Sequence, residues 1–437
     1  MTRPDVRPPE GRARRRVRAM PMAATGFGTG SPSRARDGRR GGRRRAAFAA
    51  GVLTAATLLT FGGAGTGTAQ AAPELCFGRA ATVTGTNGTP GDDVIIGTPG
   101  HDTIDGLGGD DVICGLGGID VLVGGPGNDT VHGGAGPDTV VGDSLSLGAA
   151  ASGGGADTLY GGPGPDDVIG DGYAPHGRAT GAGADRLSGG RGPDVLVGDA
   201  KGMQASGGGA DTLEGDAGDD VLVGDSVAED GDAYGAGSDV LREGAGSAGA
   251  AFGDSVAFVG SATGYGGHDV VDLGEDGGMF AIGDHLTPDG TAVGSGDDML
   301  IGGSAAEMML VGDSAVGDGT VATAGSDTVF GRGGDDALFG DNADNTAVRA
   351  VGTAGGADRL YGGAGADRLD AGPGANLLDG GADTDACGRT ASTATDFATH
   401  CEDALRPLRE AATLSDEVGA AQAAHRARLH GASPSAG

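Results

Sequence analysis

Aspartates recur in this chain at a fixed spacing of nine residues. The first six are Asp93, Asp102, Asp111, Asp120, Asp129 and Asp138. Glycines surround each of them, so backbone carbonyl oxygens lie beside the carboxylate, and Ca²⁺ takes six to eight such oxygen ligands. Carboxylates repeated this closely repel one another, and glycine loses more conformational entropy on folding than any other residue. A multivalent cation held between the repeats would offset both effects.

Each of these aspartates is the sixth residue of a nine-residue frame. The frames run without a gap from Gly88 as GTPGDDVII, GTPGHDTID, GLGGDDVIC, GLGGIDVLV, GGPGNDTVH and GGAGPDTVV. Glycine at positions one and four permits turns with positive φ. Residues seven to nine predict a short strand whose position eight points inward, because side chains alternate along a strand. Two frames would form one coil, and stacked coils would bring Asp93 near Asp111 and Asp102 near Asp120.

The frames resemble the RTX, or hemolysin-type, calcium-binding nonapeptide GGxGxDxUx, which GGPGNDTVH matches at every specified position. The resemblance covers roughly residues 88–386. It implies an all-β fold, a right-handed parallel β-roll or β-helix solenoid that forms one elongated body with several Ca²⁺ ions in its turns. It also implies carbonyl ligands at turn glycines and carboxylate ligands at position six. These ligands are Gly109, Gly118, Gly127 and Gly136, and Asp93, Asp102, Asp111, Asp120, Asp129, Asp138, Asp157, Asp166, Asp185, Asp194, Asp211, Asp220, Asp239, Asp269, Asp298, Asp327, Asp336, Asp358 and Asp367.

The rhythm changes after Val141, where a Gly-Asp pair begins to recur about every 28 residues. The glycines of these pairs are Gly142, Gly170, Gly198, Gly224, Gly253, Gly283, Gly312 and Gly340. Each unit contains two frames and an inserted segment of about ten residues rich in Ala, Gly and Ser. The segment could be a short loop projecting from every coil of a continuing roll, which we favour. Alternatively, a wider β-helix could absorb all 28 residues into its coil.

Three frames in the middle of the array lack the expected aspartate. They are EGAGSAGAAFGD, LGEDGGMFAIGD and GGSAAEMMLVGD, and each is one residue too long. One edge of the roll from Glu243 to Val311 is therefore expected to be poor in calcium, although Glu307 could substitute for an aspartate. Asn376 at position six is a weaker ligand and suggests that the roll is ending.

The first 71 residues have the composition of an export signal. They hold 14 of the 29 basic residues and three of the 61 acidic ones. An apolar run at Ala46–Phe61 and a small-x-small site at Ala69–Ala71 complete the pattern of a signal peptide. We expect general secretion, with twin-arginine export as the alternative, and Met20 or Met22 as possible true starts. The predicted organisation is a signal peptide with an extended basic n-region (1–71), an N-terminal cap (72–87), regular repeats (88–141), repeats with insertions (142–345), terminal repeats (346–386) and a disulfide-closed cap with a helical or disordered tail (387–437).

The four cysteines all follow the predicted cleavage site. An even count in an exported chain favours two disulfides. Among three connectivities, Cys76–Cys114 with Cys387–Cys401 is the most economical, because each pair then lies at one end of the repeats. Metal binding by the cysteines is the weaker interpretation, since no C-x-x-C spacing occurs.

No catalytic constellation stands apart from the repeats. None of the eight histidines belongs to an H-E-x-x-H motif, and no G-x-S-x-G elbow occurs, so we expect that the protein is not an enzyme. The net charge of −32 disfavours nucleic acid, and no segment after the signal is apolar enough to insert into a membrane. A carbohydrate-active enzyme of the type that carries RTX modules remains a minor alternative.

The sequence therefore predicts a secreted, monomeric, extracellular calcium-binding protein that acts as a structural or surface-interaction scaffold. Cytosolic calcium is too scarce to fill weak sites, so the chain is expected to fold after export. A binding module for polysaccharide or ice on a flat face of the roll is the alternative. Threonines at position seven, Thr103, Thr130 and Thr139, would suit ice, but Val112 and Val121 interrupt them.

Overall fold

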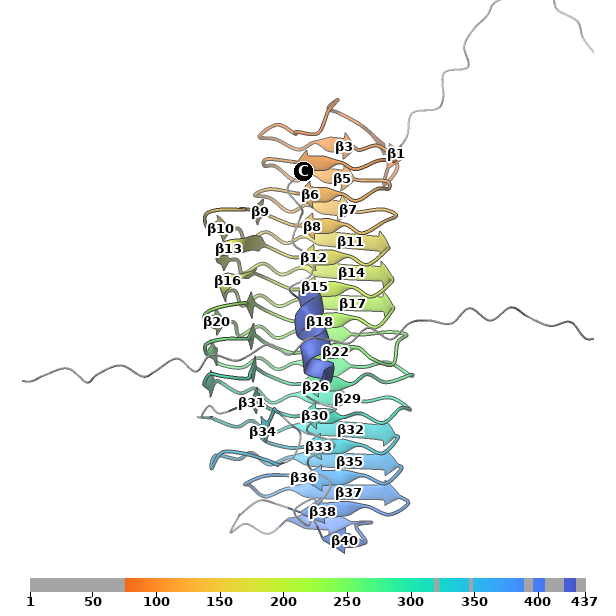
Figure 1. Cartoon of the computed structure of the whole chain (residues 1–437), viewed down its shortest axis with the longest axis vertical. Coiled ribbons are helices and arrows are strands. Elements are labelled where there is room, and N and C mark those ends of the chain that lie inside the picture. The colour runs from red at the N-terminus through yellow and green to blue at the C-terminus, as the bar shows by residue number, and fades with distance from the viewer. Residues whose placement is uncertain are drawn as a thin grey trace, which may run out of the picture. The chain divides into compact units, whose positions relative to one another are not determined.

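The computed structural model describes residues 75–317, 321, 323–345, 349–388, 396–404 and 420–429. The predicted signal peptide and most of the predicted tail lie outside these residues. The described chain is an all-β parallel solenoid in which successive coils stack on one another (Figure 1). The sequence predicted this fold class.

Two parallel sheets run along the whole stack. The first sheet contains β3 (Val94–Ile96), β5 (Val112–Cys114), β7 (Thr130–His132), β11 (Thr158–Pro163), β14 (Arg186–Arg191), β17 (Thr212–Ala217), β21 (Val240–Arg242), β25 (Val270–Asp272), β29 (Met299–Ile301), β32 (Thr328–Gly333), β35 (Arg359–Ala364), β37 (Leu377–Ala382) and β39 (Phe397–Thr399). The second sheet contains β4 (Thr103–Asp105), β6 (Val121–Val123), β8 (Thr139–Val141), β12 (Asp167–Ile169), β15 (Val195–Val197), β18 (Val221–Val223), β22 (Ala250–Phe252), β26 (Phe280–Ile282), β30 (Met309–Val311), β33 (Ala337–Phe339), β36 (Arg368–Asp370), β38 (Ala386–Gly388) and β40 (Asp403–Ala404).

The core between these sheets consists of aliphatic side chains, one from each strand, stacked in one column per sheet. The register places Ile95 beside Ile113 and Ile113 beside Val131, so position eight of each frame stacks on position eight of the next coil. These side chains are completely buried, while the first-sheet residues on either side of them are mostly part-exposed. A column of one aliphatic residue per strand buries little apolar area per coil, so the turns must contribute to the stability of the stack.

The inserted segments form a third sheet, which we call the side sheet. Its strands are β9 (Ser144–Leu145), β10 (Ala151–Ser152), β13 (Gly172–Thr180), β16 (Lys201–Ser206), β19 (Val227–Ala228), β20 (Ala233–Tyr234), β23 (Val256–Ala257), β24 (Ala262–Thr263), β27 (Leu286–Thr287), β28 (Ala292–Val293), β31 (Ala315–Val316) and β34 (Ala343–Asp344). Figure 1 shows these strands stacked along one side of the two long sheets.

The preference for short loops was therefore wrong, and the structure adopts the wider coil. Each insertion pairs in parallel with the insertion of the next coil, for example Ala151 with Ala179 and Ala205 with Ala233. Paired alanines are small enough for the two halves of an insertion to pack closely, and they form their own buried cluster. Alanine has a low strand propensity, which is why composition alone suggested loops.

A small hairpin and two disulfides close the ends of the described stack. The hairpin β1 (Leu75–Cys76) and β2 (Arg79–Ala80) is antiparallel, and Cys76 packs against Val94 and Val112. Cys76 is bonded to Cys114 and Cys387 to Cys401, which is the pairing favoured from the sequence. Each disulfide ties a terminal segment to a neighbouring coil.

A C-terminal helix, residues 420–429, lies in the predicted helical or disordered tail and packs against the side of the stack. Its buried residues are Ala421, His425 and Leu429, spaced four apart so that they share one helix face. The ring of His425 lies 5.6 Å from that of Phe280, and Gln422 Nε2 donates to Asn345 O at 2.8 Å. The helix thus shares a buried apolar cluster with Phe252, Phe280 and Met309 of the irregular middle coils. Figure 1 shows the helix in front of the second sheet, near β18.

Replacing Leu429 by serine should detach this helix while leaving the stack intact. Truncating a buried leucine destabilises its contacts by roughly 2–5 kcal/mol, so the detached state should become at least about thirtyfold more populated. Trypsin cleavage after Arg426 and Arg428 should accelerate accordingly, because cleavage follows the population of the open form. Ala424→Ser, on the exposed face, is the matched control. Equal cleavage rates in the two variants would contradict the packing of residues 420–429 against the stack.

Candidate metal centre

The predicted aspartates form two rows, one at each edge of the long sheets. The first row precedes the strands of the first sheet, and its members are Asp93, Asp111, Asp129, Asp157, Asp185, Asp211, Asp239, Asp269, Asp298, Asp327 and Asp358. Oδ1 of each aspartate from Asp111 onward accepts a hydrogen bond from the backbone N–H of the aspartate one coil earlier. The distance is 2.8 Å from Asp93 N to Asp111 Oδ1 and 2.7 Å from Asp111 N to Asp129 Oδ1. The row therefore continues unbroken through the coils.

The second row precedes the strands of the second sheet and has the same geometry. Its predicted members are Asp102, Asp120, Asp138, Asp166, Asp194, Asp220, Asp336 and Asp367. Asp120 N donates to Asp138 Oδ1 at 2.9 Å, and Asp194 N donates to Asp220 Oδ1 at 2.8 Å. All the position-six aspartates predicted from the sequence thus lie at the two edges, where the turns of adjacent coils meet.

The second carboxylate oxygen fits a bound cation. Oδ2 is buried and has no hydrogen-bonding partner in almost every member of both rows, including Asp111, Asp129, Asp138 and Asp166. A buried charged oxygen without a donor is strongly destabilising unless a positive charge or a proton neutralises it. Burial is the main cause that raises the pKa of Asp129 to about 7 and that of Asp157 to about 9. Calcium supplies the missing positive charge and accepts hard oxygen ligands at flexible geometry.

Asp93 and Asp102, the first members of the two rows, differ from the rest. Thr89 donates from both N and Oγ1 to Asp93 Oδ2, at 2.6 and 2.8 Å, and Thr98 donates in the same way to Asp102 Oδ2. Hydrogen bonds to Thr89 lower the pKa of Asp93. Threonine at position two therefore satisfies the carboxylate that elsewhere lacks a partner. The prediction that these two aspartates are ligands has the weakest geometric support.

The turn glycines bring the coils into direct backbone contact. A Cβ at Gly127 would overlap the carbonyl oxygen of Gly109, and a Cβ at Gly136 would overlap that of Gly118. Gly109, Gly118 and Gly136 also have positive φ, at 114°, 145° and 129°. The predicted carbonyl ligands are thus placed within the stacked turns, beside the position-six carboxylates. Their role as ligands stays a prediction.

The gap predicted along the second row is shorter than the sequence suggested. Glu243, at position one of its frame, is buried, and both its carboxylate oxygens lie without a partner where the missing aspartate would be. Glu307 N donates to Asp336 Oδ1 at 2.8 Å, so Glu307 continues the row. Leu273 fills the place of the acid in the coil between them and belongs to the core. Among the described residues, the second row therefore lacks an acid only in the Leu273 coil. Glu243 and Glu307 replace the missing aspartates of the other two irregular coils.

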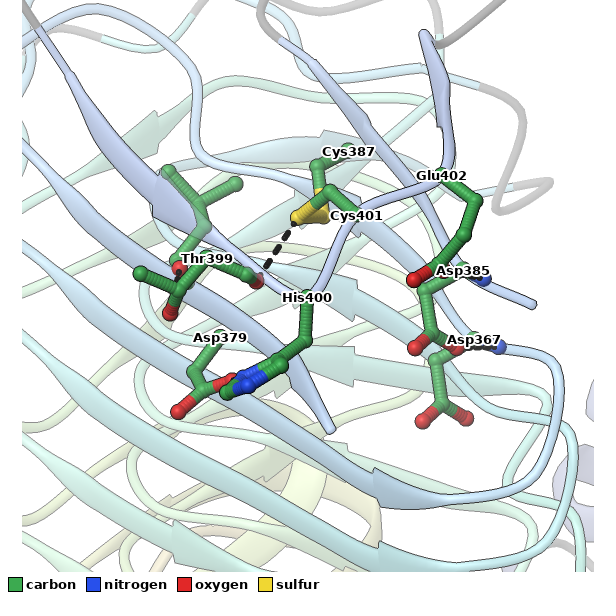
Figure 2. Close-up of a disulfide and its surroundings, with 9 residues drawn as sticks. Asp367, Asp379, Asp385, Cys387, Thr399, His400, Cys401 and Glu402 are labelled. Carbon is green, nitrogen blue, oxygen red and sulfur yellow. Dashed lines mark hydrogen bonds and ion pairs between the residues drawn. A yellow bond between two sulfur atoms is a disulfide. The ribbon is translucent and has the colours of Figure 1, made fainter. Parts of the chain in front are cut away.

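The second row also extends further than predicted. Asp367 N donates to Asp385 Oδ1 at 2.9 Å, and Asp385 N donates to Glu402 Oε2 at 3.0 Å. Figure 2 shows these three acids following one another in a column beside the Cys387–Cys401 disulfide. The first row passes through Asn376, whose Oδ1 accepts from Asp358 N at 2.9 Å.

A further set of buried aspartates, which we call the Gly-Asp row, was not among the ligands predicted from the sequence. In the sequence, the Gly-Asp pairs only marked the period of about 28 residues. The row comprises Asp143, Asp171, Asp199, Asp225, Asp254, Asp284, Asp313 and Asp341, all 2% exposed or less. Each stands at position two of its frame, one glycine after a buried strand. That placement, an acid where regular frames have glycine, leucine or threonine, was the available signal.

The fold and its edges define a class of protein, a parallel β-solenoid whose stacked turns carry rows of buried, unpaired carboxylates. The profile of one family, the RTX calcium-binding nonapeptide repeat, matches residues 87–122, 115–144, 151–172, 180–200, 206–226, 321–347 and 353–386. The chain therefore contains RTX calcium-binding repeats in several copies. The unmatched middle, residues 227–320, contains the three irregular frames. No curated protein matches the chain significantly.

Asp111→Ala should weaken calcium-dependent folding more than Asp93→Ala. Asp111 connects to coils on both sides and has an unpaired buried oxygen, whereas hydrogen bonds from Thr82 and Thr89 satisfy Asp93. We expect the calcium midpoint, followed by far-UV circular dichroism, to rise on the order of tenfold for Asp111→Ala and about twofold or less for Asp93→Ala. Equal or reversed midpoints would contradict the stacked-row arrangement.

The metal-free fold should become more stable as the pH falls from 9 to 5. Asp157 and Asp185 have pKa values raised by burial to about 9, against an ordinary value of 3.8. In this pH window the folded chain binds protons that the unfolded chain releases, so acidification stabilises the fold and alkalinisation destabilises it.

Urea unfolding in chelator at several pH values measures this dependence. Asp157→Asn with Asp185→Asn should flatten it, because two of the titrating groups are removed. The exposed pair Asp230→Asn with Asp289→Asn is the control for the change in net charge. A metal-free stability that is constant or rises with pH would refute the prediction.

Proposed function

We propose that this chain is a secreted protein that folds when it meets calcium outside the cell and then serves as a rigid extracellular scaffold. The presence of RTX calcium-binding repeats in a β-solenoid supports the calcium-binding part. One observation carries the folding part. The edges of the stack bury rows of carboxylate oxygens that have no hydrogen-bonding partner, so ion binding and folding are expected to be the same event.

Export rests on independent features of the chain. The two disulfides suit an oxidising compartment. The arginine-rich, apolar start has the composition of a signal peptide. Within the described residues we find no helix long and apolar enough to cross a bilayer.

A scaffold role without catalysis agrees with how the acidic groups are used. The paired carboxylates that could serve hydrolysis lie in the structural rows and take part in the ladder between coils. Tyr234 at the end of β20 and Tyr265 just after β24 have 48% and 86% of their surface exposed. Exposed aromatic residues on a rigid framework are typical of contact surfaces. We therefore place the partner surface on the side sheet.

Polysaccharide binding is the second candidate, because aromatic rings cluster on the outer face of the first sheet. Phe330 and Tyr361 stack with ring centroids 5.0 Å apart. His132 and Tyr160 stack at 5.9 Å beside Ser188, which donates to Asp216 Oδ2 at 2.6 Å. Ice binding has less support, because exposed Arg186, Met299 and Arg359 interrupt the outward position-seven residues of this face.

Calcium titration into chelator-treated protein tests the proposal. Far-UV circular dichroism should show a steep transition from coil to β-structure, since many linked sites fill together, and magnesium at the same concentration should not produce it. A chain already folded in chelator and indifferent to calcium would refute ion-coupled folding. The disulfides and the aliphatic column would then suffice, and the polysaccharide-binding candidate would lead.

A further inference from the structure

The Gly-Asp row lies beside the first row, at the edge where each insertion leaves and rejoins the coil. Asp143 and Asp171 belong to successive coils, and first-row Asp157 stands between them. One carboxylate oxygen from each of these three aspartates lies within 4.8 Å of the other two. Asp171, Asp185 and Asp199 form the next group of the same kind. The two groups share Asp171, so they are consecutive units of one continuous arrangement.

Backbone N–H groups hold one oxygen of most Gly-Asp carboxylates, with Asp254 as the exception. Gly183 N donates to Asp171 Oδ2 at 2.9 Å, and Gly209 N donates to Asp199 Oδ2 at 3.1 Å. The aspartate packs tightly in this position, since a Cβ at Gly181 would overlap the side chain of Asp171. The insertion thus fixes the orientation of the carboxylate.

In the group of Asp171, Asp185 and Asp199, each carboxylate keeps one oxygen without a donor. Asp171 Oδ1 and Asp199 Oδ1 are buried without a hydrogen-bonding partner, as are Oδ2 of Asp157 and Oδ2 of Asp185. All four side chains are 1% exposed or less. Lys201, two residues after Asp199, does not neutralise these oxygens, because its Nζ is paired with Asp167 Oδ1 at 2.8 Å. Three carboxylates buried this close together are strongly unfavourable unless a cation or protons neutralise them.

The residue at position two therefore determines whether the position-six carboxylate lies beside a hydrogen-bond donor or beside a second negative charge. In the first frames Thr89 donates hydrogen bonds to Asp93 and leaves no oxygen unsatisfied. In the inserted coils the position-two aspartate adds a second negative charge beside an oxygen that already lacks a donor. An aspartate at position two thus raises the density of buried negative charge in these turns.

We propose that the Gly-Asp aspartates are calcium ligands, so that two of them on successive coils and the first-row aspartate between them hold a divalent cation. Asp143, Asp157 and Asp171 form the first such site, and Asp171, Asp185 and Asp199 form the second. Two carboxylates per coil balance one divalent ion per coil, so the filled edge is neutral. The second row offers one carboxylate per coil. This inference rests on the proposed calcium-dependent function and assigns it additional ligands.

The test compares two double variants of the full chain in the same coils. Asp171→Asn with Asp199→Asn removes the charge of the Gly-Asp row while keeping an oxygen that can accept from Gly183 and Gly209. Asp166→Asn with Asp194→Asn is the matched control in the second row. Equilibrium dialysis with radioactive calcium measures the number of bound ions and their affinities, and circular dichroism at saturating calcium verifies the fold.

The Gly-Asp variant should lose ions that the wild type binds, or bind them on the order of tenfold more weakly, because affinity in oxygen sites follows the charge of the ligand set. The control should lose second-row ions and keep those of the Gly-Asp edge, so that the two deficits add in the quadruple variant. If the Gly-Asp variant fails to fold, Asp143→Asn removes one site at the end of the row and should lose calcium in the same way.

Unchanged calcium number and affinity in the folded Gly-Asp variant, or in Asp143→Asn, would overturn this inference, since the carboxylates would then only orient turn N–H groups. The control variant would still show its own loss, and calcium binding by the repeats would stand. A wild-type chain that binds no calcium would instead overturn the proposed function itself.

Discussion

Burial of unpaired carboxylates at the edges of the stack is the constraint on which the rest of the structure depends. A position-six aspartate uses one oxygen to receive the N–H of the preceding coil and leaves the other without a partner. The first oxygen sets the register between coils, because it fixes each turn against the next. The second makes the stack unfavourable until a positive charge arrives. The same side chain therefore sets the register between coils and makes the stability of the stack depend on neutralisation of its second oxygen.

The thin core follows from this arrangement. One aliphatic residue per strand cannot hold wide coils together, and the chain lacks tryptophan altogether. The side sheet adds a second apolar layer, in which Tyr173, Val227 and Val256 pack against the outer face of the second sheet. The C-terminal helix extends this layer over Phe252 and Phe280. Apolar packing is thus most extensive in the middle coils, where Leu273 replaces a carboxylate.

The sequence predicted those features of the fold that follow from its nine-residue period. The strands, the inward column and the position of each row aspartate follow from nine-residue spacing, because identical frames must stack in the same register. It did not predict features that depend on contacts between distant segments. Glu243 reaches the place of a missing aspartate from position one, and the alanines of the insertions form strands only because another insertion lies beside them. The docking of residues 420–429 depends on apolar residues far along the chain.

The insertions also change the chemistry of the edge that carries them. A regular turn closes within one frame and has glycine, leucine or threonine at position two, whereas an inserted turn leaves the stack at an aspartate. That aspartate is buried because the side sheet and the returning glycine cover it. An exposed acid at the same position would be hydrated and would need no partner. Widening the coil thus turns a surface position into a buried one, which is why the apolar side sheet and the most acidic edge occur in the same coils.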